Sequence, residues 1–411
     1  MAPRQASSAP GKMTSESTRS LIVLIALVAT LAMAPVAPEA GNIMFLVAGG
    51  AALLLLREED RRMIARPALW MPLAGFACLA LAYCLAAGGI DGLLGLVFVA
   101  PLAAMMPLIV AGRHVKLSAG LVAVLALCGA AGTAAMAVAE FTDTGTIRAG
   151  EGVANPIHFA DMALSVGFLA LTGVLFWRSP VRWLFLLGPV LAAVAVLLSG
   201  TRGALVALAA MTGTAIIVGL LVRLVSVRQF AIGAVGITVL VAVAGLAGAG
   251  QTSTVQRMMA DIADLFEVGS LTDSSISLRL QMYQGGLAAF LESPLVGHGP
   301  FDFVEAAAGR ASAAFAGTPH LHSDILDFAA SGGVLGLCAY FLFLLAPVAE
   351  AVRTVDPQTR KRLVLISATL GAGFFTMGLT NAMFGILNLT VFYGAVTLVI
   401  ASLSGPPETS E

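Results

Sequence analysis

Five arginines stand apart from the other basic residues of this chain and are its first candidates for chemistry: Arg148, Arg202, Arg257, Arg279 and Arg310. The remaining Lys and Arg residues fall in tails and loops that the apolar segments place on one side of a membrane. Basic residues mark the cytoplasmic side, so orientation gives no reason for five arginines on the other side. A guanidinium stays charged and matches phosphate with paired N–H donors, so these positions predict an anionic ligand. Among the five, we expect Arg257 and Arg310 to be solvated surface charges.

Four histidines lie on the same predicted side: His158, His298, His320 and His322. Imidazole titrates near neutral pH and can serve as a general base. A base beside guanidinium groups suits attack by a hydroxyl on a substrate that carries phosphate. The alternatives are structural: a histidine satisfied in a loop, an Arg202 side chain that extends to lipid headgroups, and an Arg279 exposed on a helix.

The elements that must position these side chains are membrane-spanning helices. The 411-residue chain is 59% hydrophobic and 11% charged, with a mean hydropathy of +0.95, which is typical of a polytopic membrane protein and excludes a soluble domain. A helix needs roughly 17 to 25 apolar residues to cross a hydrocarbon layer of ~30 Å. Segments near this length are 20–37, 42–56, 69–88, 91–111, 117–139, 158–177, 182–199, 203–222, 229–249, 331–350, 363–380 and 384–403. The predicted fold is an all-α polytopic integral membrane protein with about twelve transmembrane helices.

The charge pattern places both ends of the chain in the cytoplasm. It predicts cytoplasmic tails at 1–19 and 404–411, transmembrane helices 1–9 within 20–249, and transmembrane helices 10–12 within 331–403. One large periplasmic loop domain, 250–330, lies between helices 9 and 10.

The predicted loop domain has helical segments of its own. Hydrophobic periodicity predicts helices at 253–266 and 275–291, a turn at 294–300, and a helix over 319–330 that leads into the next span. Pro319 suits the first turn of that helix, where an N–H is not needed. In such a helix His320, Asp324 and Asp327 would share one face, and His322 would be rotated away from it.

Other chemistries lack the residues they need. The glycines are scattered through the spans and form no nucleotide-binding loop, so ATP-driven transport is unsupported. The four cysteines fall inside predicted spans without zinc-ligand spacing, and no acidic cluster demands a metal. The His-x-His-x-Asp stretch from His320 to Asp324 could be metal ligands, but the arginines predicted beside it argue against that. We expect no metal, no cofactor and no nucleic-acid partner.

Several motifs in and before the loop domain resemble one family of membrane enzymes. The stretches are Ser275-Ile-Ser-Leu-Arg279-Leu-Gln-Met-Tyr-Gln-Gly-Gly, Ser293-Pro-Leu-Val-Gly-His-Gly-Pro300, His322-Ser-Asp-Ile-Leu and Gly332-Gly-Val-Leu-Gly336. Together they resemble the O-antigen ligase and Wzy-type polymerase superfamily, with its arginine before a helix, its Pro-Leu-x-Gly-x-Gly turn and its histidine before a Gly-rich span start. Ser199-Gly-Thr-Arg202 and the segment from Arg148 to His158 are similar to further elements of that superfamily, so the resemblance covers 140–345.

This resemblance implies roles for individual residues. It points to His322 as the catalytic histidine and to Arg202 and Arg279 as catalytic arginines that bind a lipid-linked diphosphate. We add Arg148, His320 and His298 as further candidates for diphosphate or substrate binding. Two or three guanidinium groups can stabilise a departing pyrophosphate without a metal ion.

The implied function is a glycosyltransferase of the bacterial inner membrane, with its active site on the periplasmic face. The donor would be an undecaprenyl-diphosphate-linked glycan, and membrane lipids would surround the enzyme. Ligation to a hydroxyl of the lipid A core and polymerisation onto a growing glycan both remain open. Ser323 and the Gly333-to-Gly336 spacing favour ligase, whereas Leu337 stands where ligases often have Thr. Transfer to protein lacks the extra domain it would need.

A lipid-linked sugar transporter is the alternative from another class. It should place charges near the bilayer midplane and in broken helices. Here the spans are nearly free of charge, except at ambiguous ends such as Asp161, which favours surface chemistry. The oligomeric state stays open.

Overall fold

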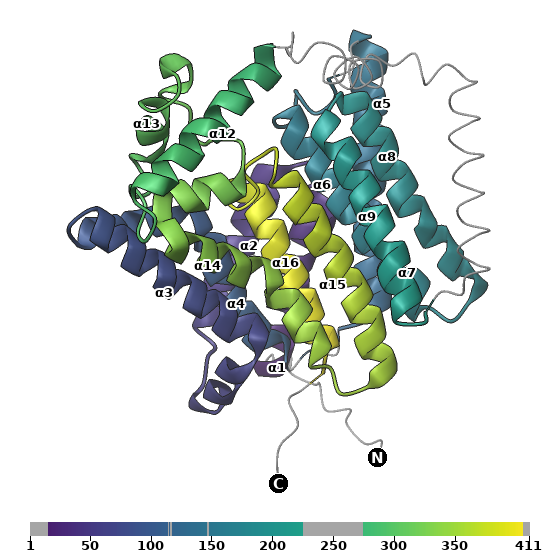
Figure 1. Cartoon of the computed structure of the whole chain (residues 1–411). Helices are drawn as coiled ribbons and strands as arrows, with labels where there is room; N and C mark the ends of the chain where they lie inside the picture. The colour runs from purple at the N-terminus through teal and green to yellow at the C-terminus, as the bar shows by residue number, and fades with distance from the viewer. Residues whose placement is uncertain (1–14, 114, 116, 146–147, 225–273, 406–411) are drawn as a thin grey trace, which may run out of the picture.

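The computed structural model describes residues 15–113, 115, 117–145, 148–224 and 274–405. They form helices and no strand, which confirms the all-α class (Figure 1). In the labels α marks an α-helix, η1 a π-helix and the other η elements 3₁₀ helices. The helices are α1 (Ser15–Leu27), η1 (Val28–Met33), α2 (Pro38–Leu53), η2 (Glu58–Ala65), α3 (Pro67–Ala86), η3 (Ile90–Val99), α4 (Ala100–Gly112), α5 (Ala119–Thr144), α6 (Pro156–Leu169), α7 (Leu171–Phe176), η4 (Pro180–Leu186), α8 (Leu187–Ser199), α9 (Arg202–Leu221), α12 (Ser274–Glu292), α13 (Phe303–Ala308), η6 (Ala313–Phe315), α14 (Asp324–Val352), α15 (Pro357–Met377) and α16 (Leu387–Leu403).

Many of these helices are long and apolar enough to span a membrane. Eight qualify within the described residues, or nine if α2 and η2, which meet at a bend of 120°, form one broken span. The protein is therefore a multi-pass membrane protein. The predicted span 42–56 lies mostly within α2 and ends at that bend. The predicted span 384–403 corresponds to α16, which is apolar but has only 17 residues. The predicted span 229–249 lies outside the described residues, so the count of twelve stays a prediction.

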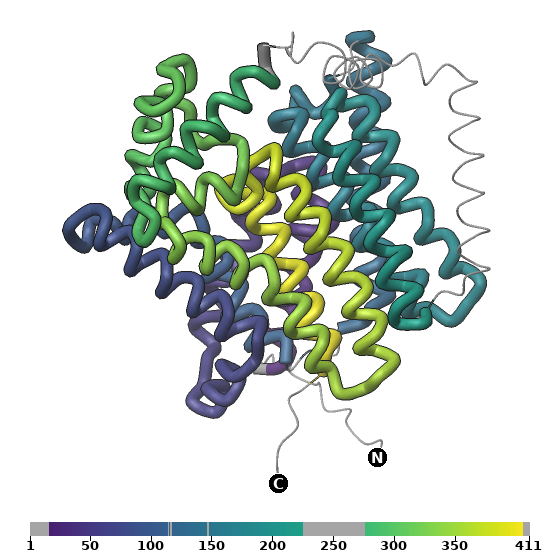
Figure 2. Tube along the Cα trace, in the orientation of Figure 1, coloured from purple at the N-terminus to yellow at the C-terminus, as the bar shows by residue number. Residues whose placement is uncertain are grey.

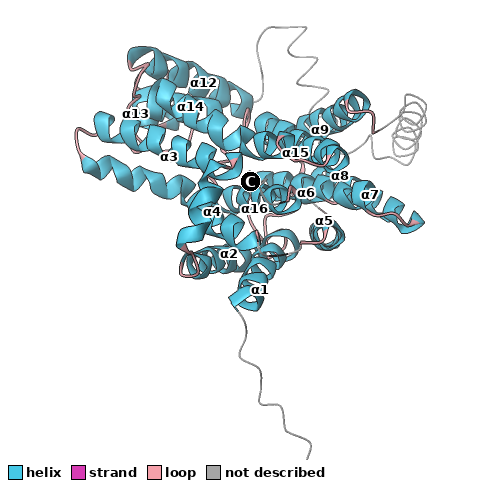
Figure 3. Cartoon of the chain, turned by 90° about the horizontal axis from the view of Figure 1, so that it is seen from below, coloured by secondary structure: helices cyan, strands magenta, loops and turns pink. Residues whose placement is uncertain are grey.

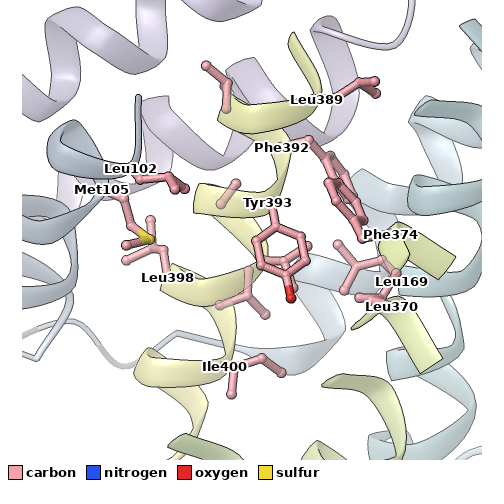
Figure 4. Close-up of a cluster of buried hydrophobic side chains, with 14 of the residues drawn as sticks. Leu102, Met105, Leu169, Leu370, Phe374, Leu389, Phe392, Tyr393, Leu398 and Ile400 are labelled. Carbon is pink, nitrogen blue, oxygen red and sulfur yellow. The ribbon is translucent and has the colours of Figure 1, made fainter. Parts of the chain in front are cut away.

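Helix α16 forms the centre of the bundle. It packs on α2 and α4 from the N-terminal part of the chain and on α14 and α15. Figure 2 shows this C-terminal helix in yellow, and Figure 3 shows α16 beside α4. Its side chains are buried on all sides, as expected for a helix that is apolar all round. Figure 4 shows Leu102 and Met105 on one side of it and Phe374 on the other. The rings of Phe374 and Tyr393 lie 4.3 Å apart.

Buried ion pairs join the helices at one end of the bundle. Arg66, before α3, pairs with Glu350 near the end of α14, with Nε 2.9 Å from Oε1, and Ser404 donates to the same carboxylate at 3.0 Å. Asp60 accepts from Arg19 of α1 at 3.3 Å and faces Arg113 at 3.6 Å. Charges this deeply buried persist only when paired, so these contacts fix the relative positions of the helices.

At the opposite end of the bundle, the glycine-containing turn 294–299 packs against the glycine-rich segment 332–336 of α14. Helix α14 is interrupted at Gly333, whose φ is 61°. The 294–299 turn fits into the interruption: the N–H of Val334 donates to the carbonyl of Pro294 at 2.7 Å, and the N–H of His298 donates to that of Ala330 at 2.9 Å. A Cβ added at Gly333 would lie 2.4 Å from the backbone carbon of Leu295. These motifs therefore hold the turn against the first turns of α14, next to His322.

The segment before α14 differs from its prediction. The helix predicted at 275–291 corresponds to α12. The helix predicted at 253–266 lies outside the described residues. The helix predicted from Pro319 begins instead at Asp324. Two contacts explain the shift: Asp327 Oδ1 accepts from the N–H of Leu321 at 2.7 Å, and the N–H of Asp324 donates to the carbonyl of Gly378 at 2.8 Å. His320 therefore does not share a helical face with the two aspartates.

Candidate active site

Three of the predicted arginines line one cavity of about 270 Å³: Arg148, Arg202 and Arg279. They come from the loop before α6, the start of α9 and the first part of α12, which are far apart in the sequence. The other lining residues are Asn155, Pro156, Ile157, Asp161, Ser199, Gly200, Thr201, Gly203, Ala204 and Thr380. The cavity therefore gathers guanidinium groups and the first turns of two helices, α6 and α9.

The start of α9 is built to face an anion. Helix α8 ends at Gly200 in the left-handed conformation, with φ 72°, and the chain turns directly into α9 at Arg202. Thr201 holds this turn against the start of α6, because its hydroxyl donates to the carbonyl of Pro156 at 3.3 Å. Gly203 and Ala204 of the first turn line the cavity. The unpaired N–H groups and the dipole of a helix N-terminus favour negative charge there, in addition to the charge of Arg202.

Arg148 lies at the rim of the cavity. Its side chain is 64% exposed and pairs with Glu151 at 3.3 Å. Two backbone bonds hold its loop in place: the N–H of Ala149 donates to the carbonyl of Leu198 at 3.0 Å, and the N–H of Gly150 donates to Glu140 at 2.6 Å. The loop is fixed while the guanidinium remains accessible.

Arg279 is partly buried in α12, and its charge acts on Asp161 without a direct bond between the two side chains. Within the described part of the chain it makes no hydrogen bond and no salt bridge. Arg310 shows the opposite arrangement, because its guanidinium pairs with Glu292 and donates to the carbonyl of Ala306. A partly buried guanidinium without a partner is costly unless a ligand supplies the negative charge.

His320 and His322 form a contact pair beside α12. Their rings meet edge to face with centroids 4.3 Å apart. His322 adopts a left-handed backbone, with φ 54°, which is uncommon for a residue with a Cβ and is often found at functional sites. Its carbonyl accepts from the hydroxyl of Tyr283 at 3.3 Å. Tyr283 lies four residues after Arg279, on the same face of α12, so one helix face positions both the arginine and the histidine segment.

Both histidines are neutral near pH 7. Burial, together with smaller contributions from the positive charges of His320, Arg279 and His158, lowers the pKa of His322 to about 4. Burial also lowers the pKa of His320 to about 4, with contributions from His158 and Arg279. A neutral imidazole can accept a proton, as a general base must. Neither ring is among the cavity-lining side chains, and the link to the cavity is α12, which carries both Arg279 and the Tyr283 hydroxyl that donates to the carbonyl of His322.

Asp161 of α6 is a cavity residue whose position at the site the sequence did not reveal. Only 2% of it is exposed, and its Oδ2 accepts from the side-chain amide of Asn381 at 3.0 Å. The sequence signal was a carboxylate inside an apolar span, which is costly and usually functional. Its place near the start of the span made it resemble an ordinary helix-end charge.

One predicted site residue, His298, lies away from the cavity. His298 lies in the 294–299 turn, where its Nε2 is 2.9 Å from the carbonyl oxygen of Ala289. It does not line the cavity, and its ring attaches the turn to α12. Arg257 lies outside the described residues. Within the described chain, no group of three or more His, Cys, Asp and Glu side chains is arranged to hold a metal ion.

The fold and the cavity define a class: a multi-pass helical membrane protein with an arginine-lined cavity at the end of the bundle opposite the buried ion pairs. Residues 187–341 match the family model described as O-Antigen ligase (Wzy_C). The match confirms the resemblance to the O-antigen ligase and Wzy-type superfamily, and it includes Arg202, Arg279 and His322. Arg148 and Asp161 precede the matched segment. No match was found among curated proteins.

Proposed function

We propose that this protein is an O-antigen ligase, which transfers a glycan from undecaprenyl diphosphate to a hydroxyl of the lipid A core. The observation that carries the proposal is the unpaired Arg279, which shares a cavity with Arg148 and Arg202 and lies beside the neutral His322. The match to the O-Antigen ligase family supports the same reaction class.

In this proposal the diphosphate occupies the cavity. Arg279 and Arg202 donate to its oxygens, and the first turn of α9 adds backbone N–H groups. At the rim of the cavity, Arg148 releases its ion pair with Glu151 and binds a phosphate oxygen of the donor instead. The polyprenyl chain lies along the apolar surface of the helices, which is why the enzyme is a membrane protein.

His322 is the proposed general base. It takes the proton of the acceptor hydroxyl while the hydroxyl oxygen bonds to the anomeric carbon of the donor sugar. The bond from that carbon to the phosphate oxygen breaks, and the diphosphate leaves with the electron pair. Direct displacement inverts the anomeric configuration, and the arginines stabilise the charge that develops on the leaving group. Neither ATP nor a metal ion takes part.

Diphosphate binding also adjusts the base. The charge of Arg279 contributes to the low pKa of His322, so an anion that neutralises this charge raises that pKa. The histidine becomes a stronger base only when the donor is bound, which restricts proton removal to the productive complex.

The proposed location is the bacterial inner membrane, with both termini in the cytoplasm and the cavity on the periplasmic face. The end of the bundle with the buried ion pairs would then face the cytoplasm, next to the basic loops. The diphosphate of a translocated lipid-linked glycan lies at the periplasmic surface, where the cavity would meet it.

A Wzy-type polymerase is the second candidate, because the same cavity would serve a growing glycan as acceptor. The purified protein in detergent should be incubated with an undecaprenyl-diphosphate-linked glycan, without nucleotide or metal, with and without lipid A core. Product that requires the core supports the ligase. Lengthening of the carrier-linked glycan without the core would indicate the polymerase. No covalent product in either case would contradict both and favour a transporter.

A further inference from the structure

The negative charge of Asp161 does not suit a site that binds only a diphosphate. Asp161 lines the cavity with the three arginines and is 2% exposed. A carboxylate repels a diphosphate and is costly to bury within a membrane span. A second part of the ligand, one that donates a hydrogen bond, would account for a carboxylate at this position.

The space between Asp161 and Arg279 is open to a ligand. Both side chains line the cavity, and the charge of Arg279 acts on Asp161. Among the described residues, however, no salt bridge or hydrogen bond joins the two. A ligand between them must present an acceptor to the guanidinium and a donor to the carboxylate. Phosphate oxygens supply the acceptor but, when ionised, no donor.

Asn381 fixes the carboxylate for this purpose. Its amide donates to Oδ2 of Asp161, it is 1% exposed, and its side chain also interacts with His158 of α6. Asp324 in turn holds the Asn381 loop, because its Oδ1 accepts from the N–H groups of Met383 and Phe384 at 2.8 and 3.2 Å. A carboxylate has about four acceptor positions, so the bond from Asn381 leaves capacity for a ligand.

We propose that Asp161, held by Asn381, binds the hydroxyl or amide N–H on the carbon next to the diphosphate-bearing carbon of the donor's first sugar. This inference rests on the proposed function. A sugar phosphate places an acceptor and a neighbouring donor on adjacent carbons, which is the pair that Arg279 and Asp161 require. The subsite makes the enzyme selective for donors whose first sugar carries a hydroxyl or acylamino group at that position.

The test compares binding of two lipids to the full-length protein: undecaprenyl diphosphate with its first sugar and undecaprenyl diphosphate without it. Asp161→Asn keeps the size of the side chain and removes the charge. We expect it to weaken binding of the sugar-bearing lipid by roughly 10- to 100-fold, as for a hydrogen bond to a charged group. Binding of the sugar-free lipid should be unchanged or tighter, because a repulsive charge is gone. Asp302→Asn, at an exposed position outside the site, should change neither.

Equal weakening of both lipids by Asp161→Asn would overturn the subsite, because Asp161 would then act through the arginines or the fold. A second arm uses a donor whose first sugar is deoxy at the neighbouring carbon. The wild-type protein should bind it as weakly as Asp161→Asn binds the native donor, and equal binding of the two donors by the wild type would contradict the proposal. Since these are binding measurements, they remain decisive if the protein transfers no glycan and the proposed function fails.

Discussion

The backbone N–H of His322 donates a hydrogen bond to Nδ1 of His320, 3.2 Å away. Because Nδ1 accepts this bond, His320 is neutral with its proton on Nε2. This bond helps hold His322 in its left-handed conformation, since it gives the backbone N–H of His322 an acceptor. His320 is therefore a positioning residue for the proposed base.

Replacing His320 with Ala should lower kcat about fivefold to tenfold, as for the loss of one neutral hydrogen bond, with little change in KM. His320→Asn, which retains a side-chain acceptor, should recover part of the loss. Steady-state kinetics with varied donor separates the two parameters. A large rise in KM with unchanged kcat would instead make His320 a donor-binding residue.

The pH dependence should differ between kcat/KM and kcat. In the free enzyme His322 has a pKa of about 4, so kcat/KM should be flat from pH 5 to neutrality on its acid side and fall only as pH drops through about 4. In the donor complex the diphosphate neutralises Arg279, so the acid limb of kcat should lie at higher pH. Coincident acid limbs would contradict the coupling between Arg279 and His322.

The same pKa has a consequence for stability. The folded pKa is below the ordinary value of 6.5, so between these values the unfolded chain binds more protons than the native one. The contribution of His322 to the free energy of unfolding is therefore fully present above pH 6.5 and is lost as pH falls toward 4. His322→Gln should flatten the pH dependence of thermal unfolding in this window.

Gly333 should not tolerate a side chain. Gly333→Ala forces a Cβ to 2.4 Å from the backbone of Leu295 and also adopts an unfavourable positive φ. Gly317→Ala is the matched control, because Gly317 also has a positive φ, 81°, but open space around it. The control should cost about 1 to 2 kcal/mol from the backbone alone. Gly333→Ala should cost clearly more and reduce the yield of folded protein on gel filtration, and equal melting temperatures would contradict the docking role.

The buried pair Arg66–Glu350 should carry stability. Glu350→Ala leaves a buried guanidinium without its carboxylate and should cost about 3 to 5 kcal/mol. Glu58→Ala removes the carboxylate of an exposed pair with Arg61 and should cost less than about 1 kcal/mol. Thermal unfolding in detergent compares them, and similar melting temperatures would show that Glu350 is dispensable.

Much of the site could be predicted from the sequence, and the failures have physical reasons. Charge placement selected five arginines, because orientation gives no reason for an arginine on the predicted periplasmic side, and the structure brings Arg148, Arg202 and Arg279 together at one cavity. The position of Asp161 could not be predicted, since its hydrogen-bond partner Asn381 and its cavity neighbour Arg279 are distant in sequence. The start of α14 was also mispredicted, because Asp327 and Gly378 supply contacts to the preceding segment that periodicity does not contain.

The most direct test of the account is donor binding and glycan transfer, measured together for His322→Ala, Arg279→Ala and Arg310→Ala. We expect His322→Ala to bind the undecaprenyl-diphosphate-linked glycan normally but to transfer it roughly 10²- to 10⁴-fold more slowly. Arg279→Ala should lose binding and transfer, and Arg310→Ala, whose arginine pairs with Glu292, should resemble the wild type. Transfer at the wild-type rate by His322→Ala, or wild-type binding and transfer by Arg279→Ala, would contradict the assignment of this cavity as the active site.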